Sequence, residues 1–154
     1  MKRLLILVAA ALSLSGCNLD VPPPTGGNTE PSDPAKETFA AELGIDISKM
    51  TKTDAGTYYK DVTVGTGATL TGNTVIVVSY LGLLKTGAQF AGVFQQTVVM
   101  TALVGGLQDA MRGMKVGGER IIVVPSALGF GPAFFGAVPP NSTLIYDVKL
   151  DQIP

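Results

Sequence analysis

Apolar and polar residues alternate along several stretches of the second half of the chain, which is the spacing of half-buried β-strands. From residue 58 to 64, one side of the predicted strand carries Tyr58 and Val62 and the other Tyr59 and Asp61. Residues 74–81 are a run rich in β-branched side chains, residues 119–124 are a further predicted strand, and the turn at residues 85–88 leads into a strand through Phe90. The pattern therefore predicts successive strands joined by tight turns.

The last predicted strand and the one predicted helix complete the pattern. Residues 143–151 alternate so that one face is apolar, with Leu144, Tyr146, Val148 and Leu150 pointing inward. Residues 105–112 are expected to be helical, because Val104, Leu107 and Met111 then share one face. We interpret the whole as an α+β domain, a strongly bent antiparallel sheet wrapped around one short α-helix.

The chain begins with two basic residues, Lys2 and Arg3, followed by a small and apolar run from residue 4 to 14. This order is typical of a secretory signal peptide, which we place at residues 1–16. The run is eleven residues long, whereas a helix needs about 20 residues to cross a bilayer, so a permanent transmembrane anchor is not expected.

The end of this segment, Leu14-Ser15-Gly16-Cys17, resembles the lipoprotein box of bacteria. The resemblance implies that Cys17 is lipidated through its sulfur and becomes the new N-terminus, which anchors the protein to a membrane of the cell envelope. Asn18 in place of aspartate implies the outer membrane, facing the periplasm, if the cell is Gram-negative. The alternative is a plain signal peptide in which the cysteine has no role.

Residues 17–37 are rich in proline and glycine and contain almost no apolar side chains after Leu19. We interpret them as a flexible, partly polyproline tether, the alternative being an arm packed on the domain. Residues 38–52 form an uncertain lead-in with a possible short helical turn at 39–43, because their apolar residues fit neither period. The folded domain is expected over residues 53–154.

The composition excludes several kinds of chemistry. The chain of 154 residues has no histidine and a single cysteine. Catalysis by Ser-His-Asp or Cys-His groups, histidine-ligated zinc and an intrachain disulfide are therefore excluded, and no metal or cofactor is expected. Eleven basic residues against twelve acidic ones leave no basic face for nucleic acid.

Charge is unevenly distributed along the domain. Residues 62–108 contain one charged residue, Lys85. Thr, Asn and Gln then cover an uncharged sheet face, or part of that face meets a partner or a second copy. We expect four charged side chains beyond this stretch to form a solvated rim that contributes little to stability; they are Arg112, Lys115, Glu119 and Arg120.

Four stretches, in this order, resemble the FKBP-type peptidyl-prolyl isomerases over roughly residues 50–154. They are Ser79-Tyr80-Leu81-Gly82-Leu83 with Gly87 and Phe90, Gly105 through Met114-Lys115-Val116-Gly117-Gly118, Val124-Pro125-Ser126 to Gly129-Phe130-Gly131, and Val138-Pro139-Pro140-Asn141-Ser142-Thr143-Leu144 with Tyr146-Asp147-Val148. The resemblance implies a sheet of five or six strands curled around a short helix, with an apolar pocket between them.

The resemblance also implies an activity that needs no ionisable group, rotation about the peptide bond before proline. The residues expected to line the pocket as its catalytic wall are Tyr80, Phe90, Val104, Leu107, Phe130 and Tyr146. The substrate is expected to contact Leu103 beneath the pocket, Val138 at its edge, the backbone N–H of Val104, and the loop residues Phe134 and Phe135.

This chain departs from the family pattern at three positions. Ala91 stands where the family usually has aspartate, Leu107 where it has tryptophan, and Phe130 where it has tyrosine. Phe94 is a candidate to replace another aromatic residue of the pocket. We expect weaker binding of ligands, including macrolide drugs, because each lost net hydrogen bond removes about 0.5–1.5 kcal/mol.

Two functions remain open from the sequence. The first is a membrane-tethered peptidyl-prolyl isomerase that acts on proline-containing, unfolded or folding exported proteins. The second is a catalytically weak chaperone or binding module that recognises unfolded apolar segments through Phe134, Phe135 and the pocket. For these two phenylalanines, exposure on a flap and packing back against Val138 and Leu107 are both consistent with the sequence.

Overall fold

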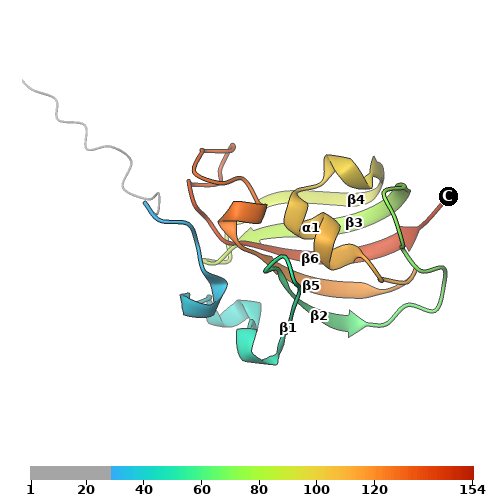
Figure 1. Ribbon diagram of the computed structural model, residues 1–154, viewed down its shortest axis with the longest axis horizontal. Helices are drawn as coiled ribbons and strands as arrows, with labels where there is room; N and C mark the ends of the chain where they lie inside the picture. Colours follow the sequence, from blue (N-terminus) through green and yellow to red (C-terminus); the bar gives the residue numbers. More distant parts are fainter. Residues whose placement is uncertain (1–28) are drawn as a thin grey trace, which may run out of the picture.

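A six-stranded sheet forms the body of the molecule, and its strand order is β1-β2-β5-β6-β3-β4. The computed structural model describes residues 29–154, so the predicted signal segment, Cys17 and the first part of the tether lie outside the described residues. The strands are β1 (Thr51–Lys52), β2 (Tyr58–Thr63), β3 (Val75–Leu84), β4 (Gln89–Val99), β5 (Glu119–Val124) and β6 (Leu144–Gln152). Every neighbouring pair is antiparallel (Figure 1).

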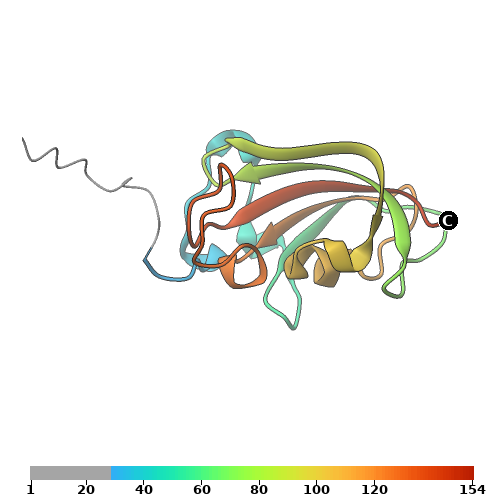
Figure 2. The same cartoon turned by 90° about the horizontal axis from the view of Figure 1, so that it is seen from above.

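One short helix, α1 (Gly105–Met111), lies across the inner face of the sheet (Figures 1 and 2). The remaining helical elements are the single 3-10 turns η1 (Pro34–Lys36), η2 (Ala41–Leu43), η3 (Ile47–Lys49), η4 (Met100–Ala102) and η5 (Ser126–Leu128). The α+β architecture, the six strands and the one helix agree with the fold expected from the sequence. No helix among residues 29–154 has the length and apolar character needed to span a bilayer.

The main core lies between α1 and the inner face of the sheet. Leu107 and Met111 of α1 pack with Ile122, Leu144 and Val148, and all five are buried. The helix approaches the sheet closely because Gly106 faces Val124, where a Cβ atom would lie 2.3 Å from Cγ1 of the valine. The missing side chain of Gly106 therefore sets how deep the helix, and Leu107 with it, sits against the sheet.

A second apolar cluster covers part of the opposite, outer face of the sheet. Its buried members are Tyr58, Val123 and Ile145, and the residues packed against them are Phe39, Leu43, Ile45, Ile47, Met50, Leu83 and Ile121. The segment of residues 31–50, here called the strap, supplies the first five of these. In Figure 2 its cyan part and α1 lie on opposite sides of the sheet. The uncertain lead-in is therefore a packed part of the domain.

Polar contacts also hold the strap. Ser32 and Ser126 exchange hydrogen bonds, since the amide of each donates to the hydroxyl of the other at 2.8 and 2.7 Å. Lys85 Nζ lies 3.3 Å from Glu37 Oε1, and Pro34 is buried. The sequence analysis placed residues 32–37 in a flexible tether. In the structure they lie against the domain, as in the alternative of a packed arm.

Arg120 does not lie on a solvated rim, where the sequence analysis expected it. Its residue is 7 % exposed, its Nε lies 2.7 Å from Asp61 Oδ1, and its Nη1 donates to the carbonyl of Ala110 at the end of α1. The guanidinium also lies 4.1 Å from the centre of the Tyr59 ring. The expectation of a solvated rim was wrong for Arg120, because β5 turns this side chain toward the end of the helix.

Candidate functional site

A cavity of about 270 Å³ opens between α1 and the sheet, beside the loop that follows β5. All twelve residues that line it are uncharged: Tyr80, Phe90, Ala91, Ala102, Leu103, Val104, Leu107, Phe130, Phe135, Gly136, Ala137 and Tyr146. The volume lies just below the range of about 300–1,000 Å³ for small-molecule sites. A cavity of this size and character fits a small apolar ring with part of its backbone.

The aromatic rings of the cavity come from separate elements. Tyr80 lies on β3, Phe90 on β4 and Tyr146 on β6, and Phe130 follows η5. The Tyr146 ring is edge-on to Tyr80 at 5.7 Å and to Phe90 at 5.6 Å between centroids. Phe90 is also edge-on to Phe130 at 6.3 Å. Because such pairs are attractive, the rings hold one another and leave a rigid apolar wall.

A glycine of β3 makes room for one of these rings. A Cβ atom at Gly82 would lie 2.8 Å from Cζ of Phe90. Since the two strands are neighbours, the ring of Phe90 can lie against the backbone of β3 only where β3 has no side chain. Gly82 is therefore a residue of the site that the sequence pattern alone did not identify, although it stands in a stretch that resembles the family.

The peptide unit between Leu103 and Val104 is held in a fixed orientation. The side-chain amide of Gln108 donates to the Leu103 carbonyl oxygen at 2.7 Å. In a trans peptide the N–H points away from the carbonyl, so the Val104 N–H is directed to the other side of the chain. Among the described residues no hydrogen bond involves this N–H, whereas the Val104 carbonyl accepts from Leu107 and Gln108. Gln108 leaves the Val104 N–H available as a donor.

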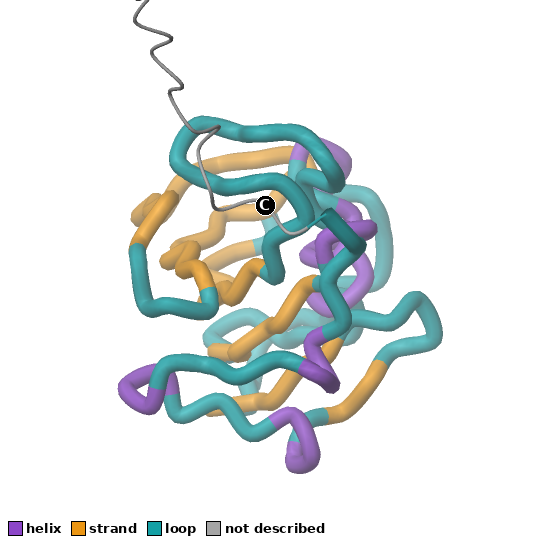
Figure 3. The backbone as a smooth tube through the Cα atoms, turned by 90° about the vertical axis from the view of Figure 1, so that its left-hand side faces the viewer, coloured by secondary structure: helices purple, strands orange, loops and turns teal. Residues whose placement is uncertain are grey.

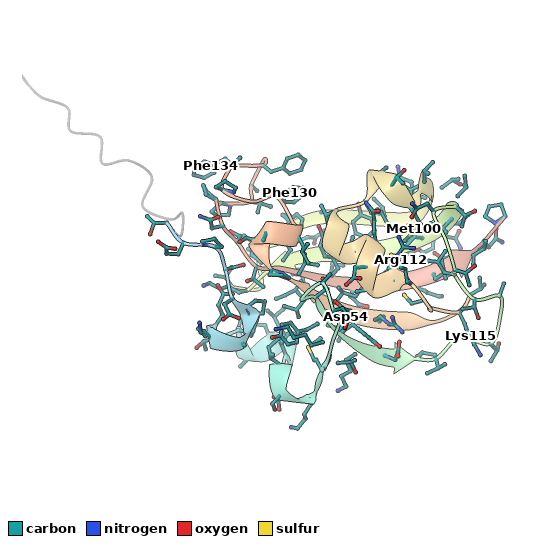
Figure 4. The ribbon with its side chains drawn as sticks, in the orientation of Figure 1. Asp54, Met100, Arg112, Lys115, Phe130 and Phe134 are labelled. Carbon is teal, nitrogen blue, oxygen red and sulfur yellow. The ribbon has the colours of Figure 1, made fainter. Side chains whose placement is uncertain are left out.

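The loop of residues 130–138, here called the flap, borders the cavity. The ring of Phe135 stacks on that of Phe130 at 4.0 Å and an interplanar angle of 10°, and Phe135 lines the cavity. Phe134 is 59 % exposed and Phe135 58 %, and Phe134 lies at the outside of the loop (Figure 4). The alternative in which both rings pack back against Val138 and Leu107 is therefore wrong.

The structure brings together all six residues expected to form the catalytic wall. Among the expected substrate contacts, Leu103, Val104 and Phe135 line the cavity, whereas Phe134 does not. Val138 was expected at the cavity edge but is 1 % exposed and belongs to the main core, because its backbone pairs with Phe135 and turns the side chain inward.

Phe94 does not replace a missing aromatic residue of the cavity. It is 80 % exposed and borders a wide depression on the outer face of the sheet, together with Leu81, Glu119 and Asp147. The expectation that Phe94 enters the pocket was wrong, because the strand continues past Phe90 and carries Phe94 to the outer face.

Tyr80 and Tyr146 are the only titratable groups that line the cavity. Burial raises the pKa of Tyr146 above its ordinary value of 10, and the neighbouring Tyr80 raises it further. The phenol of Tyr146 is therefore neutral over the physiological range. No carboxylate, amine, guanidinium or imidazole group lines the cavity.

Comparison with known proteins decides the family. Residues 67–151 match the model of the family described as FKBP-type peptidyl-prolyl cis-trans isomerase. The chain belongs to this family. It is 33% identical over 135 residues to FK506-binding protein 4 of Gibberella zeae, an alignment that covers 84% of this chain and 26% of that protein.

Two further matches come from bacteria. The chain is 30% identical over 119 residues to FkpA of Escherichia coli K12, covering 75% of this chain and 42% of FkpA. The crystal structure of FkpA has a TM-score of 0.65 at 26% identity, covering 73% of this chain and 55% of that one. A solved isomerase structure from Pseudomonas syringae pv. tomato shows the same fold, with a TM-score of 0.64 at 24% identity. The match covers 68% of this chain and 80% of that one. The chain spans less than half the length of FK506-binding protein 4 of Gibberella zeae and of FkpA.

Proposed function

We propose that this protein is a membrane-tethered peptidyl-prolyl cis-trans isomerase that acts on X-Pro bonds of exported or envelope proteins. The observation that carries the proposal is the uncharged aromatic cavity beside the Val104 N–H. Membership of the isomerase family supports the reaction. The substrates are proline-containing segments of unfolded or folding chains, because only an exposed segment can place its proline ring in the cavity.

The reaction suits a site without ionisable catalysts. Rotation about a peptide bond has a barrier of about 18–20 kcal/mol, and the cis and trans forms before proline differ by only about 0.5–1 kcal/mol. No bond breaks and no proton moves, so the site only has to stabilise the twisted amide relative to the planar one. The planar amide is the more polar form and is better solvated by water, so transfer into an apolar cavity removes part of its advantage.

The chain's own groups divide this task. The rings of Tyr80, Phe90 and Tyr146 exclude water from the proline and hold it in place. The Val104 N–H donates a hydrogen bond to a carbonyl of the bound segment, which fixes the direction of the chain through the cavity. Gln108 acts as a positioning residue, because it holds the peptide unit that carries this N–H.

The tether belongs to the same proposal. The signal segment and the box ending in Cys17 support lipidation of that cysteine and attachment to a membrane. The strap meets the domain at Ser32, whose amide donates to the hydroxyl of Ser126 in η5. The mass of the mature chain extracted from cells tests the anchor: cleavage before an unmodified Cys17 would contradict it.

The activity is tested by exchange NMR on a short X-Pro peptide in the presence of the full chain. We expect catalysed cis/trans exchange whose rate varies less than twofold between about pH 5 and 9, because the residues that line the cavity include no Asp, Glu, His, Cys, Lys or Arg. The pKa of Tyr146 is higher in the folded protein than in the unfolded chain. Its neutral phenol therefore stabilises the fold fully below about pH 10, and this contribution is lost as the pH rises further. A steep change in rate near neutral pH would contradict the mechanism.

The same experiment separates a second candidate function, a chaperone for unfolded apolar segments. Exposure of Phe134 on the flap favours it. Exchange no faster than the background, together with suppressed aggregation of an unfolded client, would establish the chaperone instead. Loss of that suppression in Phe134→Ser, with the cavity intact, would locate the client on the flap.

A further inference from the structure

The turn η5 is capped by a residue of the strap that lies 94 positions away in the sequence. The residue before the turn, Pro125, makes no side-chain hydrogen bond to it, and the first amide of a helical turn has no partner within the turn. Here that amide, of Ser126, donates to the hydroxyl of Ser32 at 2.7 Å. The Ser32 amide donates in return to the Ser126 hydroxyl at 2.8 Å. Ser126 is 1 % exposed, so the strap supplies a cap that water does not replace.

Ser126 also fixes the backbone of Phe130. Its carbonyl oxygen accepts hydrogen bonds from the amides of Gly129 and Gly131 at 3.0 and 2.9 Å. These two residues are the neighbours of Phe130 on either side, and the Phe130 ring lies edge-on to Phe90 across the cavity at 6.3 Å. A movement of Ser126 therefore changes the place of a ring that lines the cavity.

The strap holds a second segment, the turn between β3 and β4. The Ala40 amide donates to the carbonyl oxygen of Lys85 at 2.8 Å, and Glu37 Oε1 lies 3.3 Å from Lys85 Nζ. The ion pair is partly exposed and contributes little, so the backbone hydrogen bond is the firmer of the two contacts. Phe90 is the second residue of β4, directly after this turn. The strap therefore also holds the segment that leads into Phe90.

Both held segments lead into rings that face each other, Phe90 and Phe130. The strap crosses one end of the sheet between them (Figures 1 and 3), and its 3-10 turns are purple in the lower half of Figure 3. No residue of the strap lines the cavity, and the family model matches residues 67–151 only. A segment outside the matched region thus contacts both of the segments that carry these rings.

We propose that the strap is a positioning element of the isomerase site, in which Ser32 and the Ala40 amide set the separation of the Phe130 and Phe90 rings. The strap acts through η5 and the β3–β4 turn and does not touch the substrate. This role rests on the proposed isomerase function, because the two rings belong to that same cavity.

The separation of the rings matters for binding of the substrate. Dispersion attraction falls steeply with distance, and a gap of about 0.5–1 Å already loses about a quarter to a half of it. The proline ring is the same in the planar and the twisted amide, so both forms lose the same contacts when a wall ring moves. A loss of this kind raises KM and leaves kcat unchanged.

Kinetics of Ser32→Ala in the full chain test the first contact. Alanine removes the hydroxyl that accepts from the Ser126 amide and leaves that buried amide unpaired. We expect KM for an X-Pro peptide, from exchange NMR at several peptide concentrations, to rise about three- to tenfold with kcat per folded molecule unchanged. Partial unfolding alone would lower the rate and leave KM as it is. Ser32→Thr retains a hydroxyl and is expected to keep the wild-type KM.

Two further variants complete the kinetic test. Ser48→Ala is the matched control, because the Ser48 hydroxyl donates to Asp46 within the strap, and it is expected to keep the wild-type KM. Ala40→Pro removes the N–H that donates to Lys85 and fits the backbone, since φ of Ala40 is −58°. Its KM is expected to rise as in Ser32→Ala. A wild-type KM in either Ser32→Ala or Ala40→Pro overturns the proposal.

Fluorine NMR tests the first contact without measuring catalysis. In the full chain labelled with 4-fluorophenylalanine, the Phe130 resonance is assigned by its loss in Phe130→Leu. The Phe135 ring stacked on Phe130 at 4.0 Å makes this resonance sensitive to small movements. We expect Ser32→Ala to shift it and Ser48→Ala to leave it in place. An unshifted Phe130 resonance in Ser32→Ala overturns the role of the strap, whereas a wild-type chain without catalysed exchange contradicts the isomerase function itself.

Discussion

Replacing both Leu107 and Tyr146 by alanine is expected to reduce catalysed X-Pro exchange to the background rate. Leu107 forms part of the cavity wall from α1, and Tyr146 contacts the rings of Tyr80 and Phe90. Their removal opens the cavity to water and leaves the other rings without support. Transfer of the amide from water is then incomplete, and the advantage of the twisted form disappears. The measurement is the exchange NMR rate per mole of protein that is still folded.

Stability has to be controlled, because both side chains are buried. Leu→Ala costs about 2–5 kcal/mol and aromatic→Ala about 3–5 kcal/mol, which together approach the stability of an ordinary domain. Val123→Ala is a suitable comparison, since Val123 is fully buried in the cluster under the strap and does not line the cavity. It is expected to lower stability and to keep full activity in the folded fraction.

A second variant avoids the stability problem. Ala137 is exposed and lines the cavity, so Ala137→Lys places a hydrated ammonium group at the cavity wall without disturbing the core. We expect at least a tenfold lower catalysed rate, equivalent to about 1.4 kcal/mol, with an unchanged melting temperature. Ala127→Lys, exposed and outside the cavity, is the matched control. Full activity of Ala137→Lys would refute the assignment of the catalytic wall.

Gly65→Ala is expected to destabilise the fold by about 3 kcal/mol, at the upper end of the range for overpacking. Gly65 is buried, and a Cβ atom there would lie 2.4 Å from the carbonyl oxygens of Lys115 and Val116 and 2.5 Å from the amide nitrogen of Gly118. All three are backbone atoms. The clash therefore cannot be relieved by rotating a side chain, and the turn at residues 115–118 has to move away from the segment that follows β2.

Gly72→Ala provides the control for this prediction. No heavy atom lies within 4 Å of a Cβ built at Gly72, and its φ is not positive. The alanine is therefore expected to be neutral or to stabilise the protein by about 0.4–1 kcal/mol, since it restricts the unfolded chain. Urea unfolding of both variants measures the difference. Equal midpoints for Gly65→Ala and Gly72→Ala would show that the close approach at Gly65 does not constrain the fold.

The sequence predicted the elements whose side chains follow a regular period. The predicted strands at 58–64, 119–124 and 143–151 correspond to β2, β5 and β6 within one residue at each end. The helix over 105–112 corresponds to α1 within one residue. Each of these segments has one face toward the core and one toward solvent, so apolar and polar residues recur along it at a regular spacing.

The strap left no such signal. Phe39, Leu43, Ile45, Ile47 and Met50 are spaced for neither a helix nor a strand, because the strap follows an irregular path of 3-10 turns. Their burial is decided by Tyr58, Val123 and Ile145 on the outer face of the sheet. The strap and strands β5 and β6 are far apart in the sequence, so their packing cannot be predicted from the local pattern of residues 39–50.

The full length of β4 was also missed. The sequence predicted a strand through Phe90, whereas β4 continues to Val99 by pairing with β3. The residues after Phe90 carry polar and apolar side chains without strict alternation, and a register shift between Val78 and Tyr80 accompanies the irregularity at Gln95. Backbone pairing with a long neighbour therefore determined this strand.

The sequence by itself determined the family fold, the absence of imidazole and thiol chemistry in the domain, and the residue types of an apolar cavity. The family fold and the cavity residues follow from the resemblance of four stretches to the FKBP-type isomerases, and the absence of imidazole and thiol chemistry follows from composition. The tertiary structure alone decided that Phe94 faces outward, that Val138 and Arg120 are buried, and that the strap holds the outer face. Each of these depends on which distant segment lies opposite a side chain, and a bent sheet brings such segments together only when it closes around its helix.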